Sequence, residues 1–338
     1  MRVLLWFLFL AVLILPACGT PATPMPASDL IDINVCYSAP STTQSVPWYA
    51  LEKGVFEKYG LRVNLIRVQG SSQAVTALIT GDADICQAAG SAVVNAAAAG
   101  QDVVMIAAIY NTYPSILVAK PEIKTVEDLR GKRIGTGLEG SASAMATELS
   151  LRQLGLDPEQ DVVLLQVGEL PDRAAAFRAN QIDAMLTDPP YLHDFRNEGV
   201  SELFDFGKSG IPFSHTSILT TRTLLGERRE LAVSFMKAIV EAISQIKSDP
   251  EGAKAAMAKY MELDAVADAD DLSDAYENIT LPLLREAPLP DLDGIQTVID
   301  FAAITNPDAA GLDPAELVDL SIMQELQASG FIEEIQKK

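Results

Sequence analysis

Apolar positions along the chain change repeatedly between strand-like runs and helical spacing. Compact apolar runs lie at Ile31 to Tyr37, Arg62 to Val68, Ala83 to Ala88, Val103 to Ile109, Ser115 to Ala119 and Arg133 to Gly137. Amphipathic or alanine-rich segments with helical spacing separate most of these runs. Because strands that alternate with helices pair mainly in parallel, the pattern predicts an α/β fold of mostly parallel sheets flanked by helices.

The C-terminal third has a different pattern and is predicted to be helical. An apolar stripe at helical spacing runs from Leu231 to Ile246, and Asp249 with Pro250 provides a cap and a first-turn proline for another helix. We assign these residues to packing rather than to a site.

Two stretches of the chain resemble each other, which indicates two lobes with one local design. They are residues 73–85 (QAVTALITGDADI) and 172–184 (DRAAAFRANQIDA), which align without gaps. In each, an alanine-rich helix ends at a residue that tolerates the left-handed conformation, Gly81 or Asn180, and a strand begins with Asp84 or Asp183. A body of ~310 residues also suggests two lobes.

The N-terminus has the pattern of an export signal. Arg2 precedes a thirteen-residue apolar run, Val3 to Leu15, which ends in Pro16-Ala17-Cys18. As a helix this run rises roughly 20 Å, too short for the ~30 Å core of a bilayer, so we predict a signal peptide at residues 1–17. The end of the run resembles a bacterial lipobox, which predicts lipidation of Cys18 and a flexible linker over residues 18–29. The alternative is ordinary secretion with a fortuitous cysteine.

Charge excludes two classes of partner. Without residues 1–17 the chain has 24 basic and 46 acidic residues, a formal net charge of −22. Nucleic acid and anionic lipid surfaces are therefore not expected to bind, and the lipid on Cys18 is the only predicted membrane contact.

The other two cysteines, Cys36 and Cys86, lie in strand-like runs. They could pair in an oxidising compartment, but we expect two buried free thiols, because neighbouring parallel strands present awkward disulfide geometry. Neither a metal nor a cofactor is expected, since the two histidines, His193 and His215, are 22 residues apart and no CxxC motif is present.

Four ordered motifs resemble a known family. They are VPWYALEKGVFEKYGLRV (46–63), GDADI (81–85), DLRGKRIG (128–135) and DAM (183–185). They are similar to motifs of the nitrate, sulfonate, taurine and thiamine-precursor group of ABC-transporter substrate-binding proteins, and the resemblance covers roughly residues 31 to 220.

The resemblance implies a two-lobed type II periplasmic-binding fold, with a ligand cleft between the lobes. Lobe 1 would comprise residues 30–112 and 220–338, and lobe 2 residues 113–219. It further implies a monomer that delivers a small molecule to an ABC permease and its ATPase subunits. Independently, the N-terminal pattern predicts export, with the Cys18 lipid as an anchor at the outer face of the cell membrane or in the periplasm.

Candidate ligand contacts follow from the fold, because ligands of open α/β sheets bind beyond the carboxyl ends of strands. In the first half of the chain they are Ser41, Thr42, Trp48, Ser71, Ser72, Gly90, Ser91, Asn111 and Tyr113. In the second half they are Glu139, Gly140, Ser141, Glu169, Asp188 and Tyr191. Some have structural alternatives: Trp48 as a core residue, Asp188 as a turn cap before Pro189, and Glu139 as a favourable charge at a helix N-terminus.

The strand ends are rich in aromatic and hydroxyl side chains and contain no Lys or Arg. This composition favours a neutral aromatic heterocycle, such as riboflavin or a thiamine pyrimidine precursor, held by stacking. A small sulfonate, taurine or nitrate is the alternative, because helix N-termini and hydroxyls bind anions without a cation.

An enzyme is the rival class of function. Relatives on this fold include a pyrimidine synthase, so the fold does not exclude catalysis. The chain has no GxSxG or HExxH motif and no evident cysteine–histidine pair, and it carries an export signal, so we expect no enzyme activity.

Overall fold

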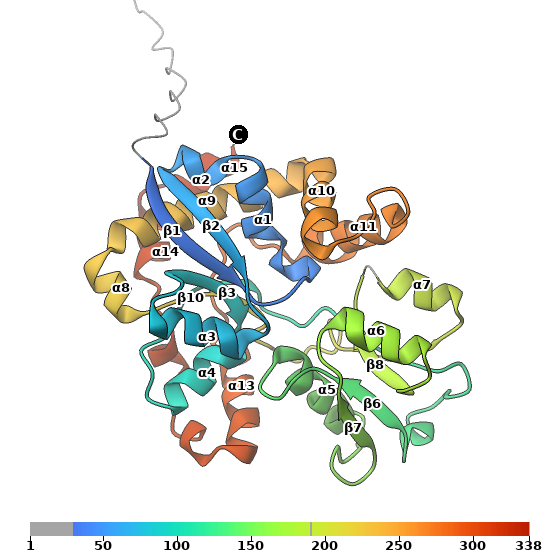
Figure 1. The fold of residues 1–338 in the computed structure, drawn as a ribbon. Helices are drawn as coiled ribbons and strands as arrows, with labels where there is room; N and C mark the ends of the chain where they lie inside the picture. Colours follow the sequence, from blue (N-terminus) through green and yellow to red (C-terminus); the bar gives the residue numbers. More distant parts are fainter. Residues whose placement is uncertain (1–29, 190, 338) are drawn as a thin grey trace, which may run out of the picture.

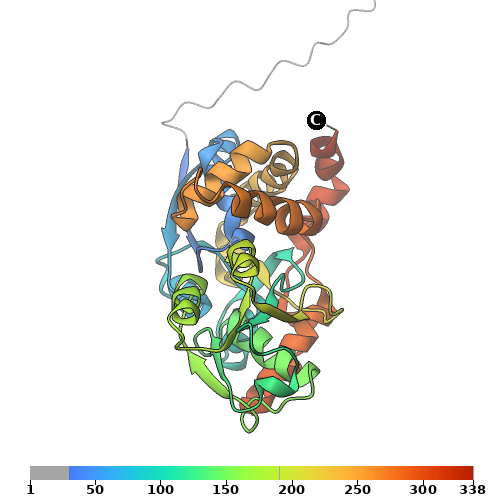
Figure 2. The same cartoon turned by 90° about the vertical axis from the view of Figure 1, so that its right-hand side faces the viewer.

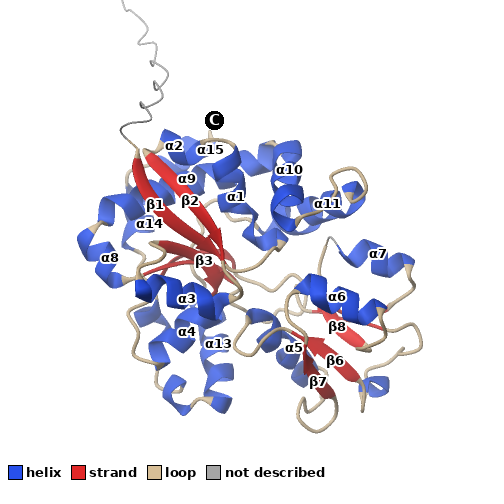
Figure 3. Ribbon diagram, in the orientation of Figure 1, coloured by secondary structure: helices blue, strands red, loops and turns tan. Residues whose placement is uncertain are grey.

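The computed structural model describes residues 30–189 and 191–337, which form two α/β lobes (Figures 1 and 3). The predicted signal peptide, Cys18 and the linker lie outside these residues. We call the part built on the sheet β2-β1-β3-β10-β4 lobe 1, and the part built on the sheet β7-β6-β8-β5-β9 lobe 2. The first sheet contains β1 (Ile31–Tyr37), β2 (Leu61–Arg67), β3 (Ile85–Ala89), β4 (Val104–Tyr110) and β10 (Thr216–Thr220). The second contains β5 (Ile116–Ala119), β6 (Arg133–Thr136), β7 (Val163–Gln166), β8 (Ala184–Thr187) and β9 (Ser201–Asp205).

Each sheet is mostly parallel, as the alternation of strands and helices predicts. β1 pairs in parallel with β2 and β3, and β6 pairs in parallel with β7 and β8. One strand in each sheet, β10 or β5, runs antiparallel to both of its neighbours. Two segments cross between the sheets, residues 111–115 after β4 and residues 206–215 before β10.

Helices cover both faces of the sheets. Lobe 1 has η2 (Thr42–Gln44), α1 (Ser45–Glu52), α2 (Val55–Lys58), α3 (Ser71–Thr80) and α4 (Gly90–Ala98). Lobe 2 has η3 (Glu127–Leu129), α5 (Ala142–Gln153), α6 (Leu170–Arg178) and α7 (Tyr191–Asn197). α1 and α2 are separate helices, because Gly54 between them adopts a left-handed φ of 66°.

The C-terminal third is helical, as predicted. It contains α8 (Arg222–Glu227), α9 (Arg229–Ser248), α10 (Pro250–Met261), α11 (Ala269–Ala275), the π-helical η4 (Tyr276–Thr280), α12 (Leu281–Leu283), α13 (Leu292–Thr305), η5 (Pro307–Ala309), η6 (Pro314–Leu317), α14 (Ser321–Ala328) and α15 (Phe331–Gln336). The predicted apolar stripe of α9 is buried against α1, α2, α14 and α15. In the turned view of Figure 2, the last helices, in orange-red and red, run along one edge of the molecule. No helix in the described ranges combines the length and apolar character needed to cross a membrane.

The sequence echo corresponds to one local design repeated in the two lobes. Gly81 and Asn180 both have left-handed backbone conformations, with φ of 78° and 59°. In lobe 1 the Asp84 carboxylate accepts a hydrogen bond from Asn34 N at 2.9 Å. In lobe 2 the Asp183 carboxylate accepts one from Arg133 N at the same distance.

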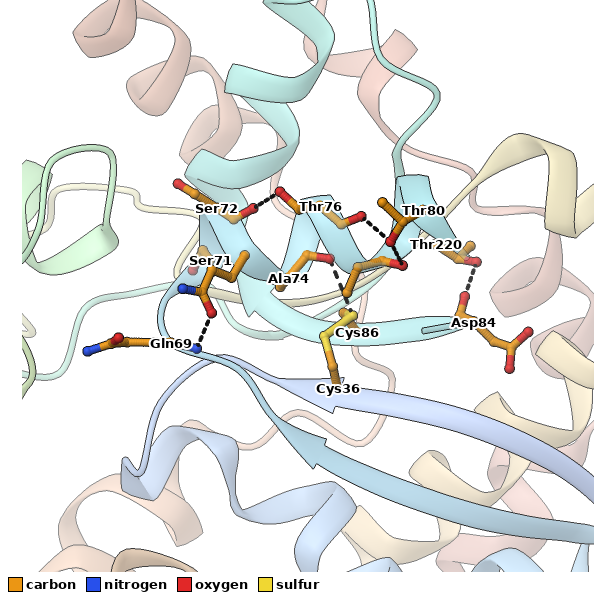
Figure 4. Close-up of a disulfide and its surroundings, with 12 residues drawn as sticks. Cys36, Gln69, Ser71, Ser72, Ala74, Thr76, Thr80, Asp84, Cys86 and Thr220 are labelled. Atoms are coloured by element: carbon orange, nitrogen blue, oxygen red, sulfur yellow. Dashed lines mark hydrogen bonds between the residues drawn. A yellow bond between two sulfur atoms is a disulfide. The ribbon is translucent and has the colours of Figure 1, made fainter. Parts of the chain in front are cut away.

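The expectation of two free thiols is wrong: Cys36 and Cys86 form a disulfide (Figure 4). The two residues are register partners on β1 and β3, and their Cα atoms are 4.4 Å apart. This separation is at the short end of the range for disulfides, so neighbouring parallel strands do accommodate the bond here.

Candidate ligand-binding site

A cavity of about 130 Å³ lies between the lobes, at the carboxyl ends of the parallel strands. Its walls come from the loops after β1 and β2 and the last residue of β3 in lobe 1, from the segments after β6, β7 and β8 in lobe 2, and from the two crossing segments. Ligands of open α/β sheets bind at this position. The cavity is therefore the candidate site, and it has room for roughly ten water molecules.

The structure brings some of the predicted contacts together in this cavity and places others elsewhere. Those that line it are Ser41, Ser71, Tyr113, Ser141, Glu169 and Asp188. Those that do not are Thr42, Trp48, Ser72, Gly90, Ser91, Asn111, Glu139, Gly140 and Tyr191.

Trp48 lies in the core of lobe 1. Its ring stacks on Tyr260 with centroids 5.3 Å apart, and Tyr37 meets it edge-on. Tyr49 and Tyr110 are buried in the same core. Among the residues that line the cavity, Tyr113 and His215 supply the aromatic rings.

Two of the displaced candidates connect the lobes instead. Thr42 Oγ1 donates a 3.2 Å hydrogen bond to Pro189 O, and Ser91 Oγ donates one of the same length to Gly140 O. Both bonds run from lobe 1 to lobe 2. The two lobes are thus in direct contact beside the cavity.

The remaining candidates that do not line the cavity lie in the packed interior, at the surface or at a helix end. Asn111 donates to Leu289 O and accepts from Asp291 N, so it ties the first crossing segment to the C-terminal third. Gly90 is packed so closely that an added Cβ would lie 2.1 Å from Ser214 Oγ. Ser72 and Glu139 are exposed, and Tyr191 is half-buried at the start of α7.

Arg173 is the residue that the sequence analysis missed. It lies one turn inside α6, so a survey of strand ends passes over it, yet it lines the cavity and is only 4% exposed. Side chains on a helix lean toward its N-terminus, so a long residue in the first turn reaches past the helix end. The expectation of a cation-free cleft is therefore wrong.

The guanidinium of Arg173 is only partly satisfied by protein. Its Nη1 donates to Gly168 O at 2.6 Å, whereas Nε is buried without a hydrogen-bond partner among the described residues. Other lining residues also carry buried polar atoms without a partner in that part of the chain: Gln44 Oε1, Ser143 Oγ, Glu169 Oε1, His215 Nδ1 and Thr216 Oγ1. Buried polar groups are normally paired, so these atoms are suited to contacts with a ligand or water.

Among the titratable groups that face the same cavity as Arg173, Asp188 and His215 have large pKa shifts. Burial raises the pKa of Asp188 to about 7, against the opposing effects of the Arg173 charge and of a hydrogen bond from Ser115. Burial lowers the pKa of the His215 imidazole to about 3, so this ring is neutral near pH 7. Asp188 and Arg173 form no ion pair within the described residues, although both line the cavity.

Helix N-termini add positive potential to the site. Ser71 at the start of α3, Ser141 at the N-cap of α5 and Glu169 at the N-cap of α6 all line the cavity. The unpaired N–H groups of a first helical turn favour an anion. Within the described ranges, no cluster of three or more His, Cys, Asp or Glu residues is suited to a metal ion.

The comparisons with known proteins agree with this geometry. The family model described as NMT1/THI5 like matches residues 42–253. YtlA of Bacillus subtilis, provisionally named a binding protein, is 26% identical over 202 residues, which cover 58% of this chain and 60% of that protein. The chain thus spans less than two thirds of this relative's length.

Solved structures share the fold at low sequence identity. The alkanesulfonate-binding protein SsuA of Xanthomonas axonopodis pv. citri, bound to MOPS, superimposes with a TM-score of 0.68 at 19% identity, covering 85% of this chain and 98% of that one. The periplasmic nitrate-binding protein NrtA of Synechocystis PCC 6803 gives 0.74 at 12% identity and covers 91% of each chain. The likeness shows that this chain has the fold of periplasmic binding proteins.

Proposed function

Because the chain belongs to the NMT1/THI5-like family, we propose that it is the extracytoplasmic solute-binding component of an ABC importer. In this proposal the cavity between the lobes holds a small molecule for delivery to a permease and its ATPase. The fold, the position of the cavity and the names of the relatives support this role. An exported, lipid-anchored location through Cys18 is part of the proposal and rests on the sequence pattern alone.

We further propose that the ligand carries an anionic group bound at Arg173. The observation that carries this proposal is the buried guanidinium with an unpartnered Nε at the cavity wall. A buried cation is costly unless an anion pairs with it, and Arg donors suit carboxylates and sulfonates. The helix N-termini at the cavity also favour an anionic group.

The cavity also has acceptors for a donor group on the same ligand. Asp188 and the unpartnered Oε1 of Glu169 face it together with Arg173. A small aminosulfonate or amino carboxylate would use both kinds of contact, whereas a plain alkanesulfonate would use Arg173 alone. Riboflavin is neutral and offers Arg173 no anionic group, so it is less well supported as the ligand.

A neutral pyrimidine is the second candidate. Tyr113 would suit the pyrimidine ring, and the carboxylates would suit its N–H groups. The Tyr113 ring, however, is already packed edge-on against Phe206, Phe213 and His215. An enzyme on this fold is less well supported, because among the residues that line the cavity there is no cysteine, no lysine and no hydrogen-bonded hydroxyl–histidine pair.

Calorimetric titration tests the proposal. Taurine, ethanesulfonate, glycine, nitrate and a hydroxymethyl aminopyrimidine are titrated into the purified protein. Saturable binding of a sulfonate or carboxylate supports the anionic ligand. Binding of the pyrimidine alone contradicts it but leaves the transport role standing, and turnover of a bound compound would contradict that role.

A further inference from the structure

An ion pair crosses between the lobes at the edge of the candidate site. Arg67 ends β2 in lobe 1, and its Nη2 lies 2.5 Å from Glu169 Oε2 at the start of α6 in lobe 2. In Figure 1 the arrowhead of β2 ends on the side of lobe 1 that faces lobe 2. Arg67 does not line the cavity, whereas Glu169 does.

Glu169 has two distinct oxygen environments. Oε2 binds Arg67, and Oε1 is buried without a partner among the described residues. Although Glu169 occupies the N-cap position of α6, its side chain makes no capping hydrogen bond. The neighbouring carbonyl, Gly168 O, binds the Arg173 guanidinium. The interlobe pair therefore positions the segment that presents both Glu169 and Arg173 to the cavity.

A second carboxylate lies on the other side of Arg67, within its own lobe. Glu262, at the C-cap of α10, which packs on α1 of lobe 1, has Oε1 4.0 Å from Arg67 Nη1. The Glu262 side chain is 84% exposed, whereas that of Glu169 is 18% exposed. Because water screens an exposed pair more strongly, Arg67 prefers Glu169 when the lobes are together.

We propose that Arg67 is a positioning residue that exchanges Glu169 for Glu262 when the lobes separate. Glu169 moves away with lobe 2, while Glu262 stays beside Arg67 on lobe 1. Glu169 thus stabilises the closed arrangement, and Glu262 competes for the same guanidinium and stabilises the open one. This inference rests on the proposed binding role only in assuming that the lobes open, and it does not depend on which ligand binds.

The two carboxylates should consequently have opposite effects on the ligand-free protein. Glu169→Gln should raise the open-to-closed ratio about five-fold, the upper end for a partly exposed pair, whereas Arg67→Gln removes both pairs and should raise the ratio only about two- to three-fold. Glu262→Gln should lower the same ratio about two-fold, as expected for a more exposed competitor. If Glu169 and Glu262 were only surface charges without this role, their replacement would not change the open-to-closed ratio in opposite directions.

Distance measurement between the lobes provides the test. Nitroxide labels are placed at Glu227→Cys on α8 and Glu122→Cys in lobe 2, both exposed, in a Cys18→Ser background without reductant so that the Cys36–Cys86 bond stays intact. Double electron–electron resonance then gives the open and closed populations without ligand.

The control is Arg62→Gln on the same strand, whose partner Asp32 belongs to lobe 1. This variant should leave the populations unchanged, and all variants should keep the melting temperature of the parent. The proposal is overturned if Glu169→Gln and Glu262→Gln shift the populations in the same direction, or if neither shifts them. Because no ligand is used, failure of the anion proposal in calorimetry would not affect this result.

Discussion

The Sγ atoms of Cys36 and Cys86 are bonded to each other across two parallel strands, β1 and β3, in the interior of lobe 1. Both residues are 0% exposed. The bond joins positions 50 residues apart, and closing a loop of this length removes enough unfolded-state entropy to stabilise the fold by about 4 kcal/mol.

Replacing both cysteines by alanine should therefore lower the free energy of unfolding by about 4 kcal/mol. Urea unfolding followed by circular dichroism measures the change. Dithiothreitol should lower the midpoint of the parent protein and leave that of the double variant unchanged. Equal midpoints for parent and variant in the absence of reductant would show that the bond does not contribute.

The pH dependence of stability should contain two opposing contributions from the cavity. For Asp188 the folded pKa of about 7 exceeds the ordinary value of 3.8, so its stabilising contribution is complete below pH 3.8 and is lost as the pH rises to 7. For His215 the folded pKa of about 3 is below the ordinary 6.5, so stability is lost as the pH falls from 6.5 toward 3. Between pH 4 and 6.5 the two contributions oppose each other.

Single variants should separate these contributions. Asp188→Asn should make the slope of stability against pH between 4 and 6.5 more positive than in the parent, because the contribution of His215 is then no longer opposed by that of Asp188. His215→Gln should make the same slope more negative than in the parent. Melting temperatures across this range measure both slopes, and parallel profiles for the two variants would refute the assignment.

Ligand affinity should also depend on the charge of Asp188. A plain anion at Arg173 is repelled by an ionised Asp188, so its affinity should rise as the pH falls through about 7. A ligand with an ammonium group needs the ionised carboxylate, so its affinity should fall over the same interval. Titrations of ethanesulfonate and taurine at pH 6 and 8 measure the two signs, and Asp188→Asn should abolish both. A pH effect that persists in this variant would assign the titration to another group.

The proposed lipid anchor has its own test. Cys18→Ser removes the residue positioned for lipidation, so the variant should leave the membrane fraction while its ligand affinity stays unchanged. Cell fractionation followed by immunoblotting measures this. Membrane retention of the variant at the parent level would remove the lipoprotein proposal.

The local hydrophobic pattern predicts the fold well, because most strands and turns of the two lobes are determined by residues close in sequence. The run Ile31 to Tyr37 is β1 without a shift, and the turn positions Gly81 and Asn180 have the expected left-handed backbone. These features depend on residues that are neighbours in sequence, and a local pattern records those residues. The disulfide depends instead on Cys36 and Cys86 being opposite each other in β1 and β3, and strand order is not visible in a local pattern.

The site was only partly predictable for a similar reason. Trp48 and Tyr49 are both buried, because α1 packs against α9 and α10 as well as the core of lobe 1, so the side chains on both faces of the helix are covered. Arg173 reaches the cavity from inside α6, and its contribution follows from side-chain direction rather than from its position after a strand.

Arg173→Met tests most directly whether Arg173 binds an anionic ligand, because it removes the charge and keeps much of the side-chain volume. Loss of a buried cation that lacks a full set of partners should leave the melting temperature unchanged or higher. Calorimetric titration of the tightest-binding sulfonate or carboxylate should show at least ~30-fold weaker binding to this variant than to the parent, as expected when a buried charge pair loses one partner. Equal affinity of parent and variant for that ligand would show that Arg173 does not bind the anionic group.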